Sequence, residues 1–553
     1  MTATSVIMSA LTLAATSGDL PVNGGVRLPE SLVGNPLVEE WDTPYQTPPF
    51  SEIELAHYEP AFDYAIAVNR AEVESIIKNP EAPTFENTIV AMTESGELLG
   101  RVAGLFFVLN NCSTSDEMQQ IAMNITPKLT ELENDISLNP ELFARVKAVY
   151  DQRKKLKLDE QDMQLLEDTY KGFARSGALL EGKDKELYRE YSSELSQLTL
   201  KFGQNAQAAT NAFSYNITDP AKVEELPAFV KEGLAAEAAA RGEQGWTVTL
   251  HAPSYSPFMT YSTQRDIKEA LYRAYNTRGI GGETDNVENI RRIAELRLKI
   301  ANLLGYKCYA DYVLEDRMAE STKTVNGFLA ELNKATLSYA KKDVAAITEY
   351  AHSLGFEGEL APWDFGYYNE KYKEAKYAIN DEQIKPYLQL ENVKNAVFML
   401  AGKLYGLTFT PVDNIETYHP EATVYEVRDD KGELMAILYL DFFPRESKRQ
   451  GAWMTEFRGV KVKDGKEQRP LVQLVMNFTK PTANTPSLLT FDEFTTFLHE
   501  FGHGLHGILA RGKYESINGT AVKRDFVELP SQIMENWATE KEYLDLWAKH
   551  YQT

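Results

Sequence analysis

Three of the eight histidines in this 553-residue chain lie close together, in the segment from Thr490 to Ala510. His499 and His503 are four residues apart, and Glu500 directly follows the first of them. If this segment is a helix, residues four apart project from one face, so both imidazoles can bind one metal ion beside a carboxylate. Two neutral imidazoles in this HExxH arrangement favour zinc. Glu500 would then be the base that accepts a proton from a metal-bound water.

The same segment has the pattern of an amphipathic helix, because its apolar residues recur at spacings of three and four. These residues are Phe494, Phe497, Leu498, Phe501, Leu505, Ile508 and Leu509. Thr490 and Glu493 form a capping-box pair at its start. Leu489 and Phe494 stand at the two positions of a hydrophobic staple. The pattern therefore predicts a helix that begins after Thr490 and carries both histidines.

A catalytic zinc site usually needs a third protein ligand and an open position for water. The segment from Arg524 to Trp537 predicts a second helix, which Asp525 can cap and whose first turn tolerates Pro530. Glu528 lies 25 residues after His503 and is well placed on such a helix if it packs against the first. Spacing alone leaves four carboxylates as possible third ligands. They are Glu515, Asp525, Glu528 and Glu535.

The motif HEFGHGLH followed by RDFVELPSQ resembles the thimet oligopeptidase family of zinc metallopeptidases. By that resemblance the ligands of one zinc ion are His499, His503 and Glu528, and the catalytic base is Glu500. His506 also matches the family's pattern, but no metal role comes with it. We interpret His506 as a partly buried helix histidine that is bonded to a neighbour.

The resemblance extends over nearly the whole chain and is nearest to the bacterial peptidyl-dipeptidase branch, which removes dipeptides from peptide C-termini. The segments that carry it include NPLVEEWDTPYQTPPFSEI, NPEAPTFENTIVAM, LNPELFARVKAVYDQR, LLGYKCYADYVLEDRMA and KRQGAWM. The sibling branch, oligopeptidase A, cuts short peptides internally and shares the zinc motif, so it remains an alternative. Either branch implies short peptides as substrates.

The family places an oxyanion-stabilising tyrosine, with a histidine and further tyrosines that hold substrate, well C-terminal to the third ligand. This sequence ends at Thr553 without that segment, inside a helix-like run, EKEYLDLWAKHYQT, that has no stop signal. We therefore expect a truncated chain that binds zinc but hydrolyses peptides poorly. A zinc-dependent peptide-binding protein that does not cut is a further alternative, although a binder needs no base at Glu500.

Composition narrows the possible partners. Apolar residues make up 43% of the chain and charged residues 25%, as in an ordinary globular protein. The net charge of −24 repels phosphate backbones, which argues against nucleic acid as a partner. Cys112 and Cys308 are isolated and form no disulfide framework. No stretch approaches the roughly 20 apolar residues of a membrane span. We expect a monomer.

The N-terminal run SVIMSALTLAA has the length of a signal-peptide core, but no Lys or Arg precedes it. We therefore expect a cytoplasmic protein, with the periplasm as the alternative if this run is the remnant of a signal peptide. The residues up to about 35 are rich in Gly and Pro, which predicts a flexible tail or linker.

The remaining patterns predict a mainly α fold. Helical periodicity runs almost unbroken from 53 to 201. It resumes at Asn286, and Gly305 ends this second helical stretch. A small sheet is expected at about 420–478, where TVYEVR and LMAILYL flank a hairpin turn and PLVQLVMNF follows. Its edge could hold an extended peptide across the metal, or the sheet could only support the zinc helix.

The chain is longer than one hydrophobic core usually organises, so two or more lobes are expected. We predict a flexible segment over 1–35, a helical lobe over 36–350 and a catalytic lobe over 351–553 that is incomplete at its C-terminus. The resemblance implies a two-lobed, zincin-like metallopeptidase with a deep central channel and the zinc ion on its floor.

Overall fold

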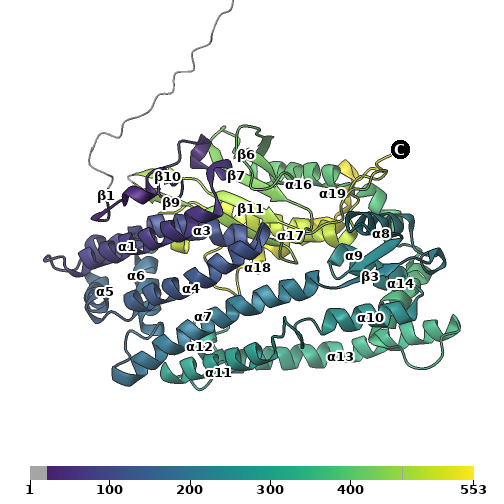
Figure 1. The fold of residues 1–553 in the computed structure, drawn as a ribbon, viewed down its shortest axis with the longest axis horizontal. Coiled ribbons are helices and arrows are strands. Elements are labelled where there is room, and N and C mark those ends of the chain that lie inside the picture. Colours follow the sequence, from purple (N-terminus) through teal and green to yellow (C-terminus); the bar gives the residue numbers. More distant parts are fainter. Residues whose placement is uncertain (1–21, 464) are drawn as a thin grey trace, which may run out of the picture.

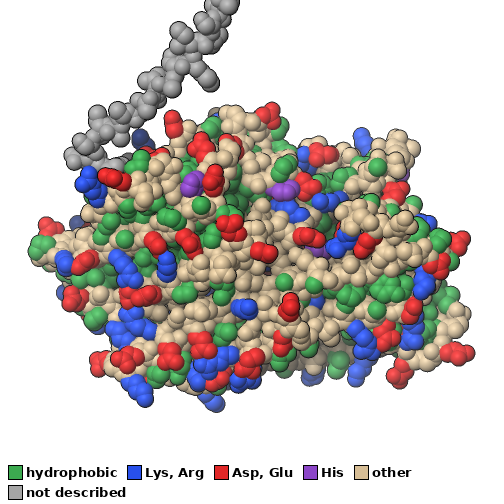
Figure 2. All heavy atoms as spheres, viewed as in Figure 1, with side chains coloured by type: hydrophobic (Ala, Val, Ile, Leu, Met, Phe, Trp, Pro, Cys, Tyr) green, Lys and Arg blue, Asp and Glu red, His purple; other side chains and the backbone are tan. Residues whose placement is uncertain are grey.

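The computed structural model describes residues 22–463 and 465–553, so the run SVIMSALTLAA lies outside the described residues. The fold is mainly helical and includes a five-stranded sheet in the region that the sequence predicts (Figure 1). No described helix is long and apolar enough to cross a membrane. Acidic and basic side chains are mixed on the face seen in Figure 2.

The first part of the chain is a run of helices that follows a short hairpin. The hairpin pairs Val22–Asn23 (β1) with Val26–Arg27 (β2), and Leu28 and Leu32 after it are buried. Residues 22–35 are thus ordered here, although their Gly and Pro content suggested a tail. The helices are α1 (Tyr58–Ile77), α2 (Ala91–Glu94), α3 (Glu97–Cys112), α4 (Asp116–Ser137), α5 (Pro140–Gln152), α6 (Glu160–Arg175) and α7 (Gly182–Asn211).

The middle of the chain is also helical, apart from one two-stranded ladder between β3 (Ser214–Ile217) and β4 (Trp246–Thr249). Figure 1 shows α7, α11 and α13 as long helices on the side away from the five-stranded sheet. Residues 326–345, within α13, are exposed on every side. The helices are α8 (Ala228–Ala240), α9 (Ala252–Tyr261), α10 (Arg265–Asn276), α11 (Val287–Leu303), α12 (Tyr309–Leu314), α13 (Thr322–Ser353), α14 (Pro362–Tyr377) and α15 (Asp381–Ile384).

The five-stranded sheet follows α16 (Leu390–Tyr405) and has the strand order β5-β6-β7-β11-β8. β11 is parallel to β7 and antiparallel to β8, so β8 is an edge strand of the described sheet. β6 and β7 are the two strands that the sequence predicts on either side of the turn. The strands are β5 (Thr408–Pro411), β6 (Thr423–Arg428), β7 (Leu434–Asp441), β8 (Trp453–Arg458) and β11 (Leu471–Val475); β9 (Lys461–Lys463) and β10 (Lys466–Gln468) form a separate hairpin.

Both faces of the sheet are covered, because alternate residues of its strands point to opposite sides. Leu440 and Leu474 join a core with α16 and α17 (Phe491–Ile508). Tyr439 and Val475 join a second core with α1, α3 and α4. The N-terminal helices therefore share a core with the sheet, across the boundary predicted at residue 350. The division into two lobes and the deep channel remain predictions.

Candidate metal centre

The helix that carries the two histidines begins where the sequence predicts. Thr490 Oγ1 accepts a hydrogen bond from the Glu493 backbone N–H at 3.0 Å, and the Glu493 carboxylate accepts one from the Thr490 N–H at 2.8 Å. This reciprocal pair satisfies two N–H groups at the start of α17. The Glu493 carboxylate also accepts from the Thr479 N–H at 2.7 Å. The helix start is thereby attached to the segment that follows the sheet.

A glycine lets the second helix of the site, α18 (Glu528–Glu535), approach α17 closely. A Cβ on Gly502 would lie 2.5 Å from the Pro530 carbonyl oxygen and 2.6 Å from the Ser531 Cα. Both distances are shorter than any ordinary contact, so only glycine fits between the two backbones. Because Gly502 is next to His503 and Pro530 is two residues after Glu528, this contact sets the distance between the histidines and that glutamate.

The structure brings three of the predicted side chains together. Glu528 Oε2 lies 3.0 Å from His503 Nε2 and 3.2 Å from His499 Nε2. One ligand atom from each of the three residues lies within 4.8 Å of the others, a spacing that one metal ion can bridge. Among the described residues no other group of three His, Cys, Asp or Glu side chains has this spacing. Ser531 Oγ donates to Glu528 Oε2 at 2.9 Å and holds the carboxylate in place.

The other three carboxylates that spacing left open have different partners. Glu535 Oε1 lies 2.6 Å from His499 Nδ1, on the ring nitrogen that does not face Glu528. Glu515 Oε1 accepts from the Gly459 backbone N–H at 2.9 Å. Asp525 accepts from two backbone N–H groups in the turn between α12 and α13, at 3.0 and 2.9 Å.

The prediction that Asp525 caps the second helix is therefore wrong. The N-cap of α18 is Val527, which makes no side-chain capping bond. The partners of Asp525 are the backbone N–H groups of Met318 and Ala319, which the fold places beside it. Asp525 thus attaches the segment before Glu528 to the helical part of the molecule.

The electrostatic environment distinguishes Glu500 from the other carboxylates of the site. Its side chain faces inward and is only 6% exposed. Burial raises the pKa of Glu500 to about 7; the nearby His499 and the Met454 backbone N–H lower it, and Glu528 raises it further. Burial also lowers the pKa of His503, which favours the neutral imidazole that binds metals.

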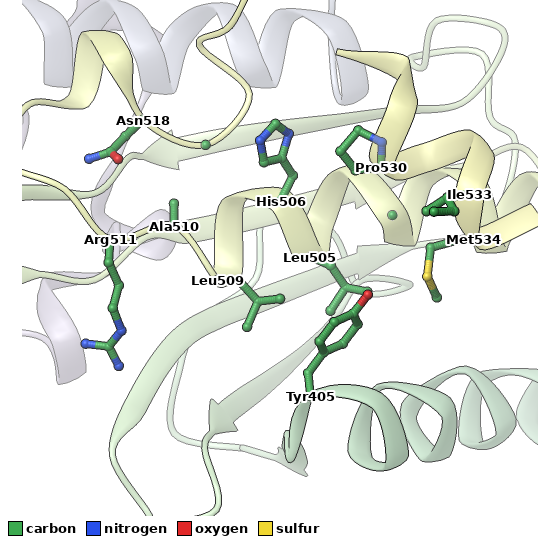
Figure 3. A pocket seen from close by; sticks show the side chains of 12 residues that line it. Tyr405, Leu505, His506, Leu509, Ala510, Arg511, Asn518, Pro530, Ile533 and Met534 are labelled. Carbon is green, nitrogen blue, oxygen red and sulfur yellow. The ribbon is translucent and has the colours of Figure 1, made fainter. Parts of the chain in front are cut away.

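His506 lies three residues after His503 on α17 and is not part of the cluster. Its Nδ1 is buried and has no hydrogen-bond partner among the described residues, so the neighbour that the sequence interpretation assigned to it is not seen there. The reason is that most side chains near it are apolar. Burial lowers the pKa of His506. It lines a cavity of about 390 Å³ with Tyr405, Leu505 and Met534 (Figure 3).

Comparisons with known proteins give one family match and several similar proteins. Residues 258–553 match peptidase family M3. The dipeptidyl carboxypeptidase of Escherichia coli (strain K12) is 36% identical over 525 residues, which are 94% of this chain and 76% of that protein. Oligopeptidase A of Salmonella typhimurium is 34% identical over 526 residues, which are 94% of this chain and 77% of that protein. A solved structure of a putative oligoendopeptidase F from Bacillus anthracis aligns with a TM-score of 0.49 and 14% identity, over 90% of this chain and 73% of that one.

Proposed function

Because the chain belongs to peptidase family M3 and is a metallopeptidase, we propose that it hydrolyses short peptides with one zinc ion held by His499, His503 and Glu528. We propose Glu500 as the general base. The observation that supports this assignment most strongly is the convergence of the three side chains, with Glu528 Oε2 within 3.2 Å of both imidazole Nε2 atoms.

The residues at this centre fit zinc. Two imidazole nitrogens and one carboxylate oxygen are a common ligand set of catalytic zinc, which keeps a further position for water. The hydrogen bond between Glu535 and His499 Nδ1 leaves the Nε2 lone pair free to bind a metal, and such carboxylate partners are typical of zinc-binding histidines. Bound there, zinc would polarise the scissile carbonyl and lower the pKa of a water.

Glu500 supports hydrolysis rather than binding alone. Its carboxylate is next to the proposed ligands and is buried, and the Met454 backbone N–H lies near it. In the deprotonated form it can accept a proton from the attacking water and pass it to the leaving amine. A protein that only binds peptides would not need a buried base at this position.

We propose that the edge strand β8 holds the substrate. β8 is an edge strand of the described sheet and packs against α17, and its Met454 N–H lies near Glu500, so β8 offers a backbone with which an extended peptide at the centre can pair. Recognition through backbone groups would accept many side chains. The alternative is that the sheet only supports α17. The channel implied by the resemblance would add a steric filter for short, flexible peptides.

For the position of the cut, we propose release of dipeptides from peptide C-termini, with internal cleavage of short peptides as the alternative. The similarity of 36% to a dipeptidyl carboxypeptidase supports the first, and the similarity of 34% to oligopeptidase A supports the second. We also propose a monomer in the cytoplasm, with the periplasm as the alternative. Both cysteines are free thiols, which suits a reducing compartment.

The decisive experiment replaces Glu500 by Gln and measures both peptide cleavage and bound zinc. The Glu500→Gln variant should lose about 10²–10⁴-fold in rate while it keeps its zinc, because only the proton acceptor is removed. Asp492→Asn is the matched control, since Asp492 is exposed in the first turn of the same helix. Cleavage by Glu500→Gln at the parent rate would disprove the base. Peptide binding without any cleavage by the zinc-loaded parent would favour the non-hydrolytic alternative.

A further inference from the structure

The loop from β7 to β8, residues 442–452, starts at a buried ion cluster. Asp441, the last residue of β7, is 0% exposed, and Lys448 within the loop is 1% exposed. The Asp441 carboxylate accepts from Lys448 Nζ at 2.8 Å, from two nitrogens of Arg445 at 2.9 and 2.6 Å, and from the Tyr418 hydroxyl at 2.7 Å. All of its strong acceptor positions are therefore used.

Lys448 closes the loop on itself. Besides the carboxylate, its Nζ donates to the backbone carbonyls of Asp441 at 3.1 Å and Phe443 at 2.8 Å. An ammonium group has three N–H donors, so each of them has an acceptor. The Lys448 ammonium group thus binds both Asp441, the last residue before the loop, and the backbone of the loop itself.

Neighbouring parts of the fold bind the rest of the loop through its backbone. The Arg449 N–H donates to the Asn111 carbonyl at 2.9 Å, and the Thr114 N–H donates to the Ser447 carbonyl at 2.8 Å. The Asn477 side chain donates to the carbonyls of Arg449 and Gly451, at 3.0 and 2.6 Å. These bonds hold the loop between the end of α3 and the segment that follows β11.

The loop leads directly into the edge strand beside the metal centre. β8 begins at Trp453, whose ring lies under the Arg449 guanidinium at 4.5 Å, and the next residue is Met454. The Met454 and Glu456 side chains pack against the backbone of α17, because a Cβ on Gly507 would lie 2.8 Å from the first and 2.5 Å from the second. A shift of the loop would therefore shift β8 against α17, the helix that carries His499 and His503.

A buried ion pair contributes little net stability compared with apolar residues of the same size, because both charges lose their hydration. Its fixed hydrogen-bond directions, by contrast, determine a geometry. We propose that the Asp441–Lys448 pair is a positioning device that fixes edge strand β8 beside α17 and so sets how well a peptide backbone pairs with β8. The inference rests on the proposed function, in which β8 holds the substrate.

The test measures peptide binding rather than turnover. The probe is a fluorescent short peptide with a ketomethylene isostere at the scissile bond, and its affinity for the zinc-loaded chain is measured by fluorescence anisotropy. A second set of probes carries one N-methyl group at successive amides. An N-methyl group on the amide that pairs with β8 should weaken binding to the parent by about 3–10-fold, the size of one backbone hydrogen bond. We call this factor the N-methyl penalty.

Lys448→Met removes the ammonium but keeps the length of the side chain. We expect unchanged zinc affinity, because the proposed ligands lie on α17 and α18. We also expect weaker peptide binding and an N-methyl penalty close to one, which means that N-methylation no longer changes the affinity. Tyr418→Phe removes a single hydrogen bond to Asp441 and should reduce the N-methyl penalty partially. This milder variant serves as the test if Lys448→Met does not fold. Asp364→Asn is the matched control, since this buried carboxylate pairs with Arg265 between α10 and α14 and should leave the penalty unchanged.

The outcomes separate the two proposals. If the N-methyl penalty measured for the parent is unchanged in folded Lys448→Met and Tyr418→Phe, the positioning role is overturned and substrate pairing with β8 still holds. If N-methylation weakens binding to the parent at none of the amides, both the pairing with β8 and the positioning role are overturned. An equal loss of penalty in Asp364→Asn would show a general loss of rigidity and would also overturn the inference.

Discussion

Glu535 Oε1 lies 2.6 Å from Nδ1 of His499, while Nε2 of the same ring faces Glu528 at 3.2 Å. An imidazole has two nitrogens, and a proton on Nδ1 that is shared with Glu535 leaves the lone pair on Nε2. Glu535 therefore selects the tautomer that can bind a metal and fixes the orientation of the ring. Sequence spacing had left Glu535 as a competing metal ligand. In the structure it is instead a hydrogen-bond partner of His499 Nδ1, the ring nitrogen that does not face Glu528.

This arrangement predicts the effect of Glu535→Gln. The amide can still contact Nδ1 but carries no charge, so His499 becomes a weaker base. We expect zinc to bind about 10–100-fold more weakly, as for other removed carboxylate partners of metal-binding histidines. Competition with a chromogenic chelator measures this affinity. Glu540→Gln, at an exposed position after α18, should bind zinc like the parent, and equal affinity of both variants would contradict the role of Glu535.

The contact between α17 and α18 makes a second prediction. In Gly502→Ala the new methyl group would meet the Pro530 carbonyl at 2.5 Å, so the helices must separate and Glu528 must move away from both histidines. We expect a loss of about 1–3 kcal/mol in unfolding free energy, as for other overpacked contacts, together with weaker zinc binding. Gly203→Ala, in α7, meets nothing within 4 Å and should be neutral or stabilising by up to about 1 kcal/mol. Denaturant unfolding and zinc titration of the two variants give the comparison.

A third prediction concerns the dependence of stability on pH. Burial, with a smaller contribution from the Glu515 carboxylate, raises the pKa of Glu456 on β8 from 4.5 to about 7. A carboxyl with a raised folded pKa stabilises the fold below its unfolded pKa, and that contribution is lost as the pH rises through the folded pKa. For Glu456 the loss occurs between about pH 4.5 and 7 and amounts to about 3 kcal/mol.

Glu456→Gln should remove this loss. Urea unfolding of parent and variant at pH 5 and pH 8 measures it, and the variant should gain stability relative to the parent by up to about 3 kcal/mol at the higher pH. Equal differences between the two proteins at both pH values would show that Glu456 does not titrate in this range.

The sequence predicted helix α17 well because its signals are local. The capping pair of Thr490 and Glu493 and the apolar spacing lie within the helix itself, and α17 starts at Phe491 as they indicate. The choice among the four carboxylates was not local. It depends on how closely α18 approaches α17, which the Gly502 contact determines, and only the resemblance to known peptidases selected Glu528 in advance.

The errors have the same physical origin. Asp525 was expected to cap its own helix, but its partners are Met318 and Ala319, 207 and 206 residues away along the chain. Strand β8 was not predicted, because its sequence WMTEFR shows no clear alternation of apolar and polar residues. Its position at the metal centre depends on pairing with β11 and on the buried Asp441 cluster, which no local pattern reveals.

The last prediction decides between the two positions of cleavage. An enzyme that releases dipeptides must locate the C-terminus of its substrate, and a charge-assisted hydrogen bond to the free carboxylate is the simplest way to do so. Such a bond contributes about 1.5–3 kcal/mol, so a C-terminal amide should lower kcat/KM by about 10–100-fold. Mass spectrometry of the products from matched peptides measures this, with an acetylated N-terminus as the control that should have no effect. Dipeptides from the free acid and little product from the amide would support C-terminal release. Equal cleavage of both at an internal bond would favour the oligopeptidase A alternative and would leave the roles of His499, His503 and Glu528 unchanged, because the metal centre acts on the scissile bond in either case.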